Sequence, residues 1–176
     1  MAGDPHNEVA VLDYQPGWVA VFDAERERIA AALALVVPRP SAIEHVGSTA
    51  VAGMAAKPIV DIMVTYARMP AVDEVAAALA AIAYELVDKP EFTESLFFRR
   101  GETLATTIHL HVTTETSAFG RQMLRFRDAL RASPRLAAEY AAFKRELAAR
   151  FPDDRPSYTQ AKGPFISGII GEPPSS

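Results

Sequence analysis

The chain has 176 residues, with 18 Lys and Arg against 22 Asp and Glu for a net charge of −4, and it contains no cysteine. This length suits one domain with a hydrophobic core, whereas the negative charge argues against a broad nucleic-acid surface and the lack of cysteine excludes disulfides and thiolate metal ligands. No apolar run approaches the roughly 18 residues of a membrane span, and residues 1–14 lack the pattern of a signal peptide, so we expect a cytoplasmic protein with neither membrane nor nucleic acid as a partner.

The first helix is expected to begin at Pro16, whose fixed φ suits a first helical position, and to end near Val36. Its apolar stripe consists of Trp18, Phe22, Ile29 and Leu33. Glu25 falls inside this stripe, where an unpaired carboxylate would be costly to bury. The pattern favours an ion pair between Glu25 and an arginine over a catalytic role. A further hypothesis places Glu25 at the edge of a binding pocket, where it would orient a basic phosphate ligand.

Residues 42–64 predict two short strands joined by a polar elbow, around which the rest of the chain is organised. Side chains of a strand alternate between its faces, so Val60 and Ile62 share the core face while Asp61 points from the other. In the elbow, the hydroxyl and N–H groups at Ser48 can be directed at an anion, since Gly47 lets the backbone approach closely. Thr49 is expected to share this role. The alternative is an ordinary loop at residues 47–49 and an aspartate at position 61 that only ends a strand ladder.

Residues 70–83 predict a second helix, and residues 84–87 predict a short strand. The expected buried stripe of the helix is Val72, Val75, Leu79 and Ile82. Two further strand-like runs, 96–100 and 106–113, are separated by a segment containing Gly101, which indicates a hairpin. The order of these elements favours a mixed sheet with a helix on one face. In the second run His109 and His111 share a face with Thr107, which suits binding of a metal or a phosphate.

From Ser117 onward the pattern becomes helical. Two packed helices are expected on either side of Pro134, and a last helix is expected from Pro156. Lys162 lies within the apolar stripe of that last helix, which predicts an amine that extends past apolar neighbours. A break is expected near Gly163, because Pro164 cannot continue a helix without losing a hydrogen bond.

Several motifs carry a resemblance to known proteins. Val46-Gly47-Ser48 followed by Asp61-Ile62-Met63-Val64 resembles the signature of the DNA polymerase beta-like nucleotidyltransferase superfamily. The longer string EHVGSTAVAGMAAKPIVDI resembles the GrpB family, as do YQPGW near Tyr14, HLHV at His109, and the spacing of Tyr158 and Lys162. The motifs extend over nearly the whole chain.

The resemblance implies an α/β (α+β) fold, in which a nucleotidyltransferase-like mixed β-sheet has flanking helices and a C-terminal helical cap. We expect a single domain over residues 1–176, with the sheet core in about 1–115 and helices in about 116–172. The resemblance further implies a metal-dependent nucleotidyltransferase that acts on a nucleoside triphosphate and an unknown small-molecule or protein acceptor. Asp61 would be the catalytic residue and, with His109 and His111, would bind a divalent metal.

The remaining expected roles follow from position in the motifs. Phosphate contacts are assigned to Gly47, Ser48, Thr49, Lys57, Arg99, Arg100 and Lys162. A supporting place beside the site is assigned to Glu25, His45 and Tyr158.

Met63 occupies the position where many members of the superfamily carry a second acid, so one metal, or none, is expected rather than two. Magnesium prefers oxygen ligands, whereas imidazole suits manganese or zinc better, and the metal could be any of the three. Two alternatives remain open at this point: a nucleotide-binding or regulatory module without catalysis, and a metal-dependent phosphoester hydrolase.

Overall fold

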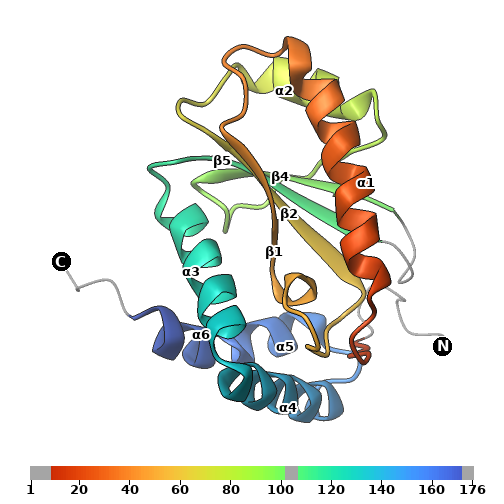
Figure 1. Cartoon of the computed structure of the whole chain (residues 1–176), viewed down its shortest axis with the longest axis vertical. Coiled ribbons are helices and arrows are strands. Elements are labelled where there is room, and N and C mark those ends of the chain that lie inside the picture. The colour runs from red at the N-terminus through yellow and green to blue at the C-terminus, as the bar shows by residue number, and fades with distance from the viewer. Residues whose placement is uncertain (1–8, 102–106, 172–176) are drawn as a thin grey trace.

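The computed structural model describes residues 9–101 and 107–171, which fold around one five-stranded mixed sheet (Figure 1). The strands are β1 (Ala42–Val46), β2 (Ile59–Tyr66), β3 (Glu85–Leu86), β4 (Ser95–Arg100) and β5 (Thr107–Thr114), in the spatial order β1-β2-β5-β4-β3. β2 and β5 run parallel, and the other neighbouring strands run antiparallel. The predicted α+β fold with a mixed sheet is confirmed.

The two central strands carry the acid and the histidines singled out from the sequence. Their register pairs Asp61 with His109 and Met63 with His111. Because side chains alternate along a strand, these four residues share one face, here called the open face. Ile62, between Asp61 and Met63, is fully buried on the opposite face, here called the core face.

The core face is covered by α1 (Gly17–Ala32) and α2 (Val72–Ala80) (Figure 1). Helix α1 is shorter than predicted, since the chain tightens into the 3-10 turn η1 (Leu33–Leu35) before Pro38. The predicted burial of Val72 is wrong: its side chain is 41% exposed, because only the later turns of α2, with Val75 and Leu79, reach the core.

Glu25 lies in this core and is fully paired. Its carboxylate accepts hydrogen bonds from Arg28 Nη1 at 2.8 Å and from Tyr84 Oη at 2.8 Å, and it forms an ion pair with Arg100. The expected ion pair with an arginine is therefore present. The hypothesis that Glu25 borders a pocket on the open face is wrong, because α1 packs on the core face.

The C-terminal helices are α3 (Ala118–Ala132), α4 (Pro134–Arg150), α5 (Arg155–Ala161) and α6 (Gly163–Ile170), which lie together at one end of the molecule (Figure 1). Ser117 and Ser133 cap α3 and α4, each accepting a hydrogen bond from a backbone N–H of the first turn. Pro134 starts α4, and the predicted break near Gly163 is found between α5 and α6. A second core, with Val51, Met54 and Leu130, joins these helices to the elbow.

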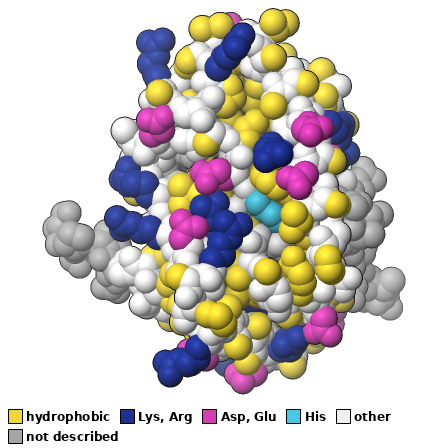
Figure 2. Space-filling model, in the orientation of Figure 1, with side chains coloured by type: hydrophobic (Ala, Val, Ile, Leu, Met, Phe, Trp, Pro, Cys, Tyr) yellow, Lys and Arg dark blue, Asp and Glu magenta, His cyan; other side chains and the backbone are white. Residues whose placement is uncertain are grey.

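None of the helices in the described ranges is long and apolar enough to cross a membrane. On the face drawn in Figure 2, acidic and basic side chains are interspersed. That distribution is typical of a solvated surface.

Candidate functional site

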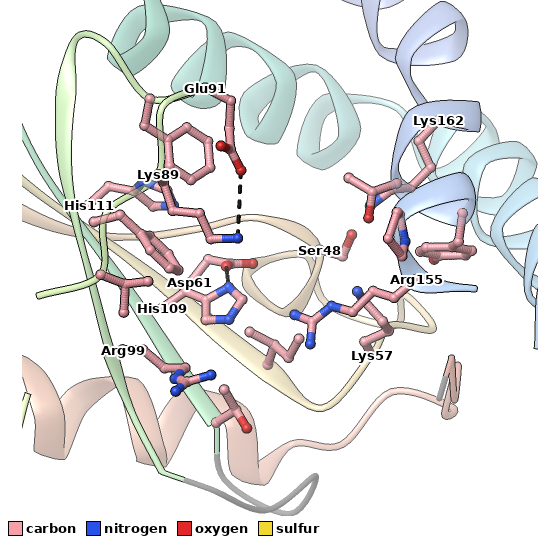
Figure 3. Close-up of a pocket in the computed structure, with 18 of the residues that line it drawn as sticks. Ser48, Lys57, Asp61, Lys89, Glu91, Arg99, His109, His111, Arg155 and Lys162 are labelled. Carbon is pink, nitrogen blue, oxygen red and sulfur yellow. Dashed lines mark ion pairs between the residues drawn. The ribbon is translucent and has the colours of Figure 1, made fainter. Parts of the chain in front are cut away.

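A cavity of about 870 Å³ opens between the open face of the sheet and the C-terminal helices. Its walls come from the elbow, from β2, β4 and β5, from the segment between β3 and β4, and from α4 and α5. Asp61 and His109 lie at the centre of the view in Figure 3. On one side of them are Lys57, Arg155 and Lys162, and on the other side are Lys89, Glu91 and His111.

Asp61 and His109 form a pair across the parallel strands. His109 Nδ1 lies 3.3 Å from Asp61 Oδ1, so the imidazole N–H donates to the carboxylate. Burial raises the pKa of the Asp61 carboxyl, but the hydrogen bond and charge of His109 outweigh it and hold that pKa below its usual value. Asp61 therefore stays ionised, which is the form that binds a cation.

Gly47 brings the elbow against this carboxylate. Its φ is +71° and its ψ is −171°, a conformation that is essentially restricted to glycine. A Cβ at this position would lie only 2.3 Å from Asp61 Oδ2. The next residue, Ser48, begins the 3-10 turn η2 (Ser48–Ala50) and lines the cavity. The close approach expected at Gly47 is thus an approach to Asp61 itself.

His111 lines the same cavity but has different neighbours. Its side chain is only 4% exposed, and the rings of Phe92, Phe97 and Phe119 lie 5.0, 5.1 and 5.1 Å away. Burial lowers the pKa of His111 to about 4, so the ring is neutral. In residues 9–101 and 107–171 no three His, Cys, Asp or Glu side chains group together to hold a metal. Asp61 and His109 are therefore a two-residue donor set, with His111 among aromatic rings.

Four cationic side chains form what we call the basic end of the cavity: Lys57, Lys144, Arg155 and Lys162. The ammonium groups of Lys57 and Lys162 lie 5.2 and 4.8 Å from the ring centroid of Tyr158, which supports both. Burial and the charges of Arg155 and Lys162 lower the pKa of Lys57 to about 7. Burial is also the main cause of the lowered pKa of Lys162. The pKa values of both lysines are lowered because their amines are buried and lie close to other basic groups.

Lys144 and Arg155 were missed in the sequence, although both carried a signal. Lys144 follows Tyr140 by one helical turn and so lies on the apolar stripe of α4, where its side chain is 2% exposed. Arg155 precedes Tyr158 by three residues and Lys162 by seven, which places all three on one helical face. A charged residue in register with buried aromatic residues was the available clue.

The side chains of Thr49 and His45 are buried beneath the elbow and do not line the cavity. His45 stacks on Phe22 at 4.7 Å, and its Nε2 lies 3.0 Å from Thr49 Oγ1. The Thr49 hydroxyl donates to the carbonyl oxygen of Ile59 at 3.1 Å. The Thr49 hydroxyl therefore does not reach the cavity, because it is buried and used within the fold.

Three long side chains from α3 and α4 hold the backbone of the elbow and of the connector, residues 50–58, which leads from the elbow into β2. Arg127 donates to the carbonyl oxygen of His45, Arg131 to that of Ala50, and Lys144 to that of Ala55 at 2.6 Å. Since these carbonyl groups would otherwise lack partners in the interior, the helices fix the shape of the segment that carries Gly47 and Ser48.

Arg99 and Arg100 point to opposite faces of β4. Arg99 lines the cavity and lies 3.6 Å from Glu85, whereas Arg100 pairs with Glu25 on the core face. The assignment of Arg100 to phosphate is wrong, since adjacent residues of a strand cannot both face one site.

The family model described as GrpB protein matches residues 8–172 of this chain. The glutamate-rich protein GrpB of Alkalihalophilus pseudofirmus is 30% identical over 176 residues, covering 98% of this chain and 99% of that protein. The UPF0157 protein YqkA of Bacillus subtilis is 33% identical over 92% of this chain, which spans only 46% of YqkA. The crystal structure of conserved protein GrpB from Enterococcus faecalis superimposes with a TM-score of 0.81 at 31% identity, covering 92% of this chain and 94% of that one.

Proposed function

The chain belongs to the GrpB family, and we propose that it binds a nucleoside triphosphate and acts as a metal-dependent nucleotidyltransferase on a small-molecule or protein acceptor. The observation that carries this proposal is the basic end itself, in which four basic side chains gather beside an ionised Asp61. In the described part of the chain, none of Lys57, Lys144, Arg155 and Lys162 forms an ion pair.

Clustered cations in a cavity need an anionic partner, because each one raises the electrostatic cost of the others. A triphosphate supplies several negative charges in a compact group and accepts hydrogen bonds from ammonium and guanidinium groups. The cavity volume lies within the range of small-molecule sites. Arg155 and Lys162 would hold the outer phosphates, and the hydroxyl of Ser48 would contact them from the elbow.

Asp61 and His109 fit a single divalent metal whose remaining ligands come from the phosphates and water. One carboxylate and one imidazole suit manganese or zinc, and magnesium would depend on the Asp61 oxygens. When bound, such an ion polarises a phosphoryl oxygen and neutralises developing charge. The residues of the chain align the phosphates, and Lys57 and Arg155 would stabilise the pyrophosphate that leaves.

A calorimetric titration of ATP with magnesium, manganese or zinc tests the proposal. We expect the wild type to bind ATP and Lys162→Met to lose roughly ten- to a hundredfold in affinity, since a hydrogen bond to a charged group contributes about 1.5–3 kcal/mol. The control is Arg135→Met, because Arg135 is exposed, pairs with Glu139 at 3.3 Å and does not line the cavity. Equal affinities for the wild type and Lys162→Met would contradict the proposal.

A second candidate, a nucleotide-binding module without catalysis, is favoured by the two-residue donor set and by Met63 in place of a second acid. Incubation with ATP labelled at the α-phosphate separates the two functions. Release of labelled product or labelling of an acceptor supports transfer, whereas tight binding with the label unchanged supports the binding module.

A further inference from the structure

The side of the cavity away from the basic end is aromatic. It is lined by Phe92, Phe97 and His111, which we call the aromatic end. The rings of Phe92 and Phe97 lie 5.4 Å apart, and that of His111 lies 5.0 and 5.1 Å from them. Phe119 packs behind this group, 5.4 Å from Phe92, but does not line the cavity. Three rings thus meet at one wall of a space whose opposite wall is cationic.

Asp61 and His109 lie between these two ends (Figure 3). A ligand that occupies the whole cavity therefore needs an anionic group at one end and a planar or apolar group at the other. The Phe97 ring also lies 5.1 Å from the His109 imidazole, so the aromatic wall continues up to the central pair. A nucleoside triphosphate has this distribution of charge and aromatic surface.

We propose that the aromatic end binds the base of the nucleotide, which packs against Phe92 at the mouth of the cavity, an inference that rests on the proposed function. Phe97 is buried in the wall, whereas Phe92 is only partly buried and comes from the irregular segment between β3 and β4. Phe92 is therefore the ring that a base can cover. Stacking on an aromatic side chain is available to every base, since each base has a π face.

His111 supplies a second, independent observation. Its Nδ1 is buried and has no hydrogen-bond partner in residues 9–101 and 107–171. A buried polar atom without a partner is costly, and ligand groups are one of the ways in which such atoms are satisfied. The amino group or a ring nitrogen of a base offers that partner once the base displaces the edge of Phe92, whose ring stands at 86° to the imidazole.

The test compares ATP with inorganic tripolyphosphate, which has the same phosphate chain but no base. We expect Phe92→Ala to lower ATP affinity roughly five- to a hundredfold, the range found for removing one base-stacking ring. Tripolyphosphate affinity should stay unchanged. Phe119→Ala is the matched control, because it removes a ring from the same aromatic group without changing the cavity wall, and it should leave both affinities unchanged. Phe92→Leu keeps apolar volume in the segment and should show the same selective loss, so a folding defect in Phe92→Ala does not decide the result.

The outcomes separate this inference from the proposed function. A loss confined to ATP supports the aromatic end as the base site. The inference is overturned if both Phe92 variants keep the wild-type affinity for ATP, or if they lose affinity for ATP and for tripolyphosphate by the same factor. This holds even if Lys162→Met abolishes tripolyphosphate binding and so supports the basic end. If the wild type binds neither compound, the proposed function fails and this inference fails with it.

Discussion

The two faces of the sheet differ in the partners that their charged side chains have. On the core face, the Glu25 carboxylate meets two guanidinium groups and a phenol, and every partner is supplied by the fold. On the open face, four cationic side chains gather near one carboxylate, and Asp61 already accepts a hydrogen bond from His109. Among the residues that the structure describes, the carboxylate of the first arrangement is paired within the fold, whereas the four basic side chains of the second form no ion pair.

The difference shows how a buried charge is assigned to stability or to binding. A network in which each charged group has its partner stabilises the folded chain by itself. A cluster of like charges lowers stability unless a ligand of opposite charge enters. Changes to the core face should therefore reduce stability, whereas changes to the open face should alter ligand affinity or its dependence on pH.

The largest expected effect belongs to the core face. Glu25→Gln removes the only negative charge of the network and turns an amide N–H group toward Arg28 or Arg100. Breaking a buried pair by removing one partner costs about 3–5 kcal/mol, and partial exposure of both arginines favours the lower value. Urea unfolding measures this loss, and ATP affinity of the folded protein should not change.

Asp23→Asn on the same helix is the control for Glu25→Gln. Asp23 lies 3.6 Å from Arg26 on the exposed surface, and such pairs contribute less than about 1 kcal/mol. If both variants lost the same stability, the core network would be no more important than a surface pair. A loss of ATP affinity in Glu25→Gln with stability intact would move Glu25 to the binding site.

A smaller effect on stability and a direct effect on the open face are expected for Gly47→Ala. The new Cβ would meet Asp61 Oδ2 at 2.3 Å, and its backbone conformation would be strained, which together cost about 2 kcal/mol. Asp61 must also shift, so ATP affinity should fall. Gly53→Ala is the comparison: Gly53 has a φ of +75°, but its Cβ would meet no atom within 4 Å. It should lose about 1 kcal/mol of stability and keep its ATP affinity.

Alternation along strands was the part of the site that the sequence could predict. It placed Asp61 and His109 on the face opposite Val60 and Ile62, as the parallel register of β2 and β5 has them. The same rule, applied to β4, would have separated Arg99 from Arg100. The phosphate role predicted for both arginines rests on their positive charge and not on their positions in a strand.

The basic end could be predicted only in part, because it is made by tertiary packing. Lys57 and Lys162 lie in recognisable motifs, but Lys144 reaches the site through the packing of α4 on the connector. The angle at which a helix packs cannot be predicted from the spacing of residues within that helix. The aromatic end depends in the same way on residues of three segments: Phe92 before β4, Phe97 within it, and His111 in β5.

The last expected effect concerns Lys144 and measures the cost of burying a cation among like charges beside the open face. Lys144 Nζ donates to the carbonyl oxygen of Ala55 and lies 4.8 Å from the ring centroid of Tyr140. Burial, followed by the charges of Lys162, Arg145 and Lys57, lowers its pKa from 10.5 to about 7, and the charge of Asp61 opposes this shift. The folded chain therefore binds this proton less tightly than the unfolded chain does.

Between pH 7 and about 10 the unfolded chain holds a proton on Lys144 that the folded chain has released. Stability from this group consequently rises with pH through that window, by up to about 1.4 kcal/mol for each pH unit.

Lys144→Met lacks the titrating group, so the stability of the wild type relative to this variant should increase from pH 7 to pH 9 in urea unfolding. Lys57 and Lys162 are present in both proteins, and only the difference between the two profiles reports on Lys144. Tripolyphosphate at saturation should reduce the wild-type slope, because an anion in the cavity favours the protonated amine. Parallel profiles for the wild type and Lys144→Met would show that the bond to Ala55 keeps Lys144 charged, and that the open face tolerates its like charges without a ligand.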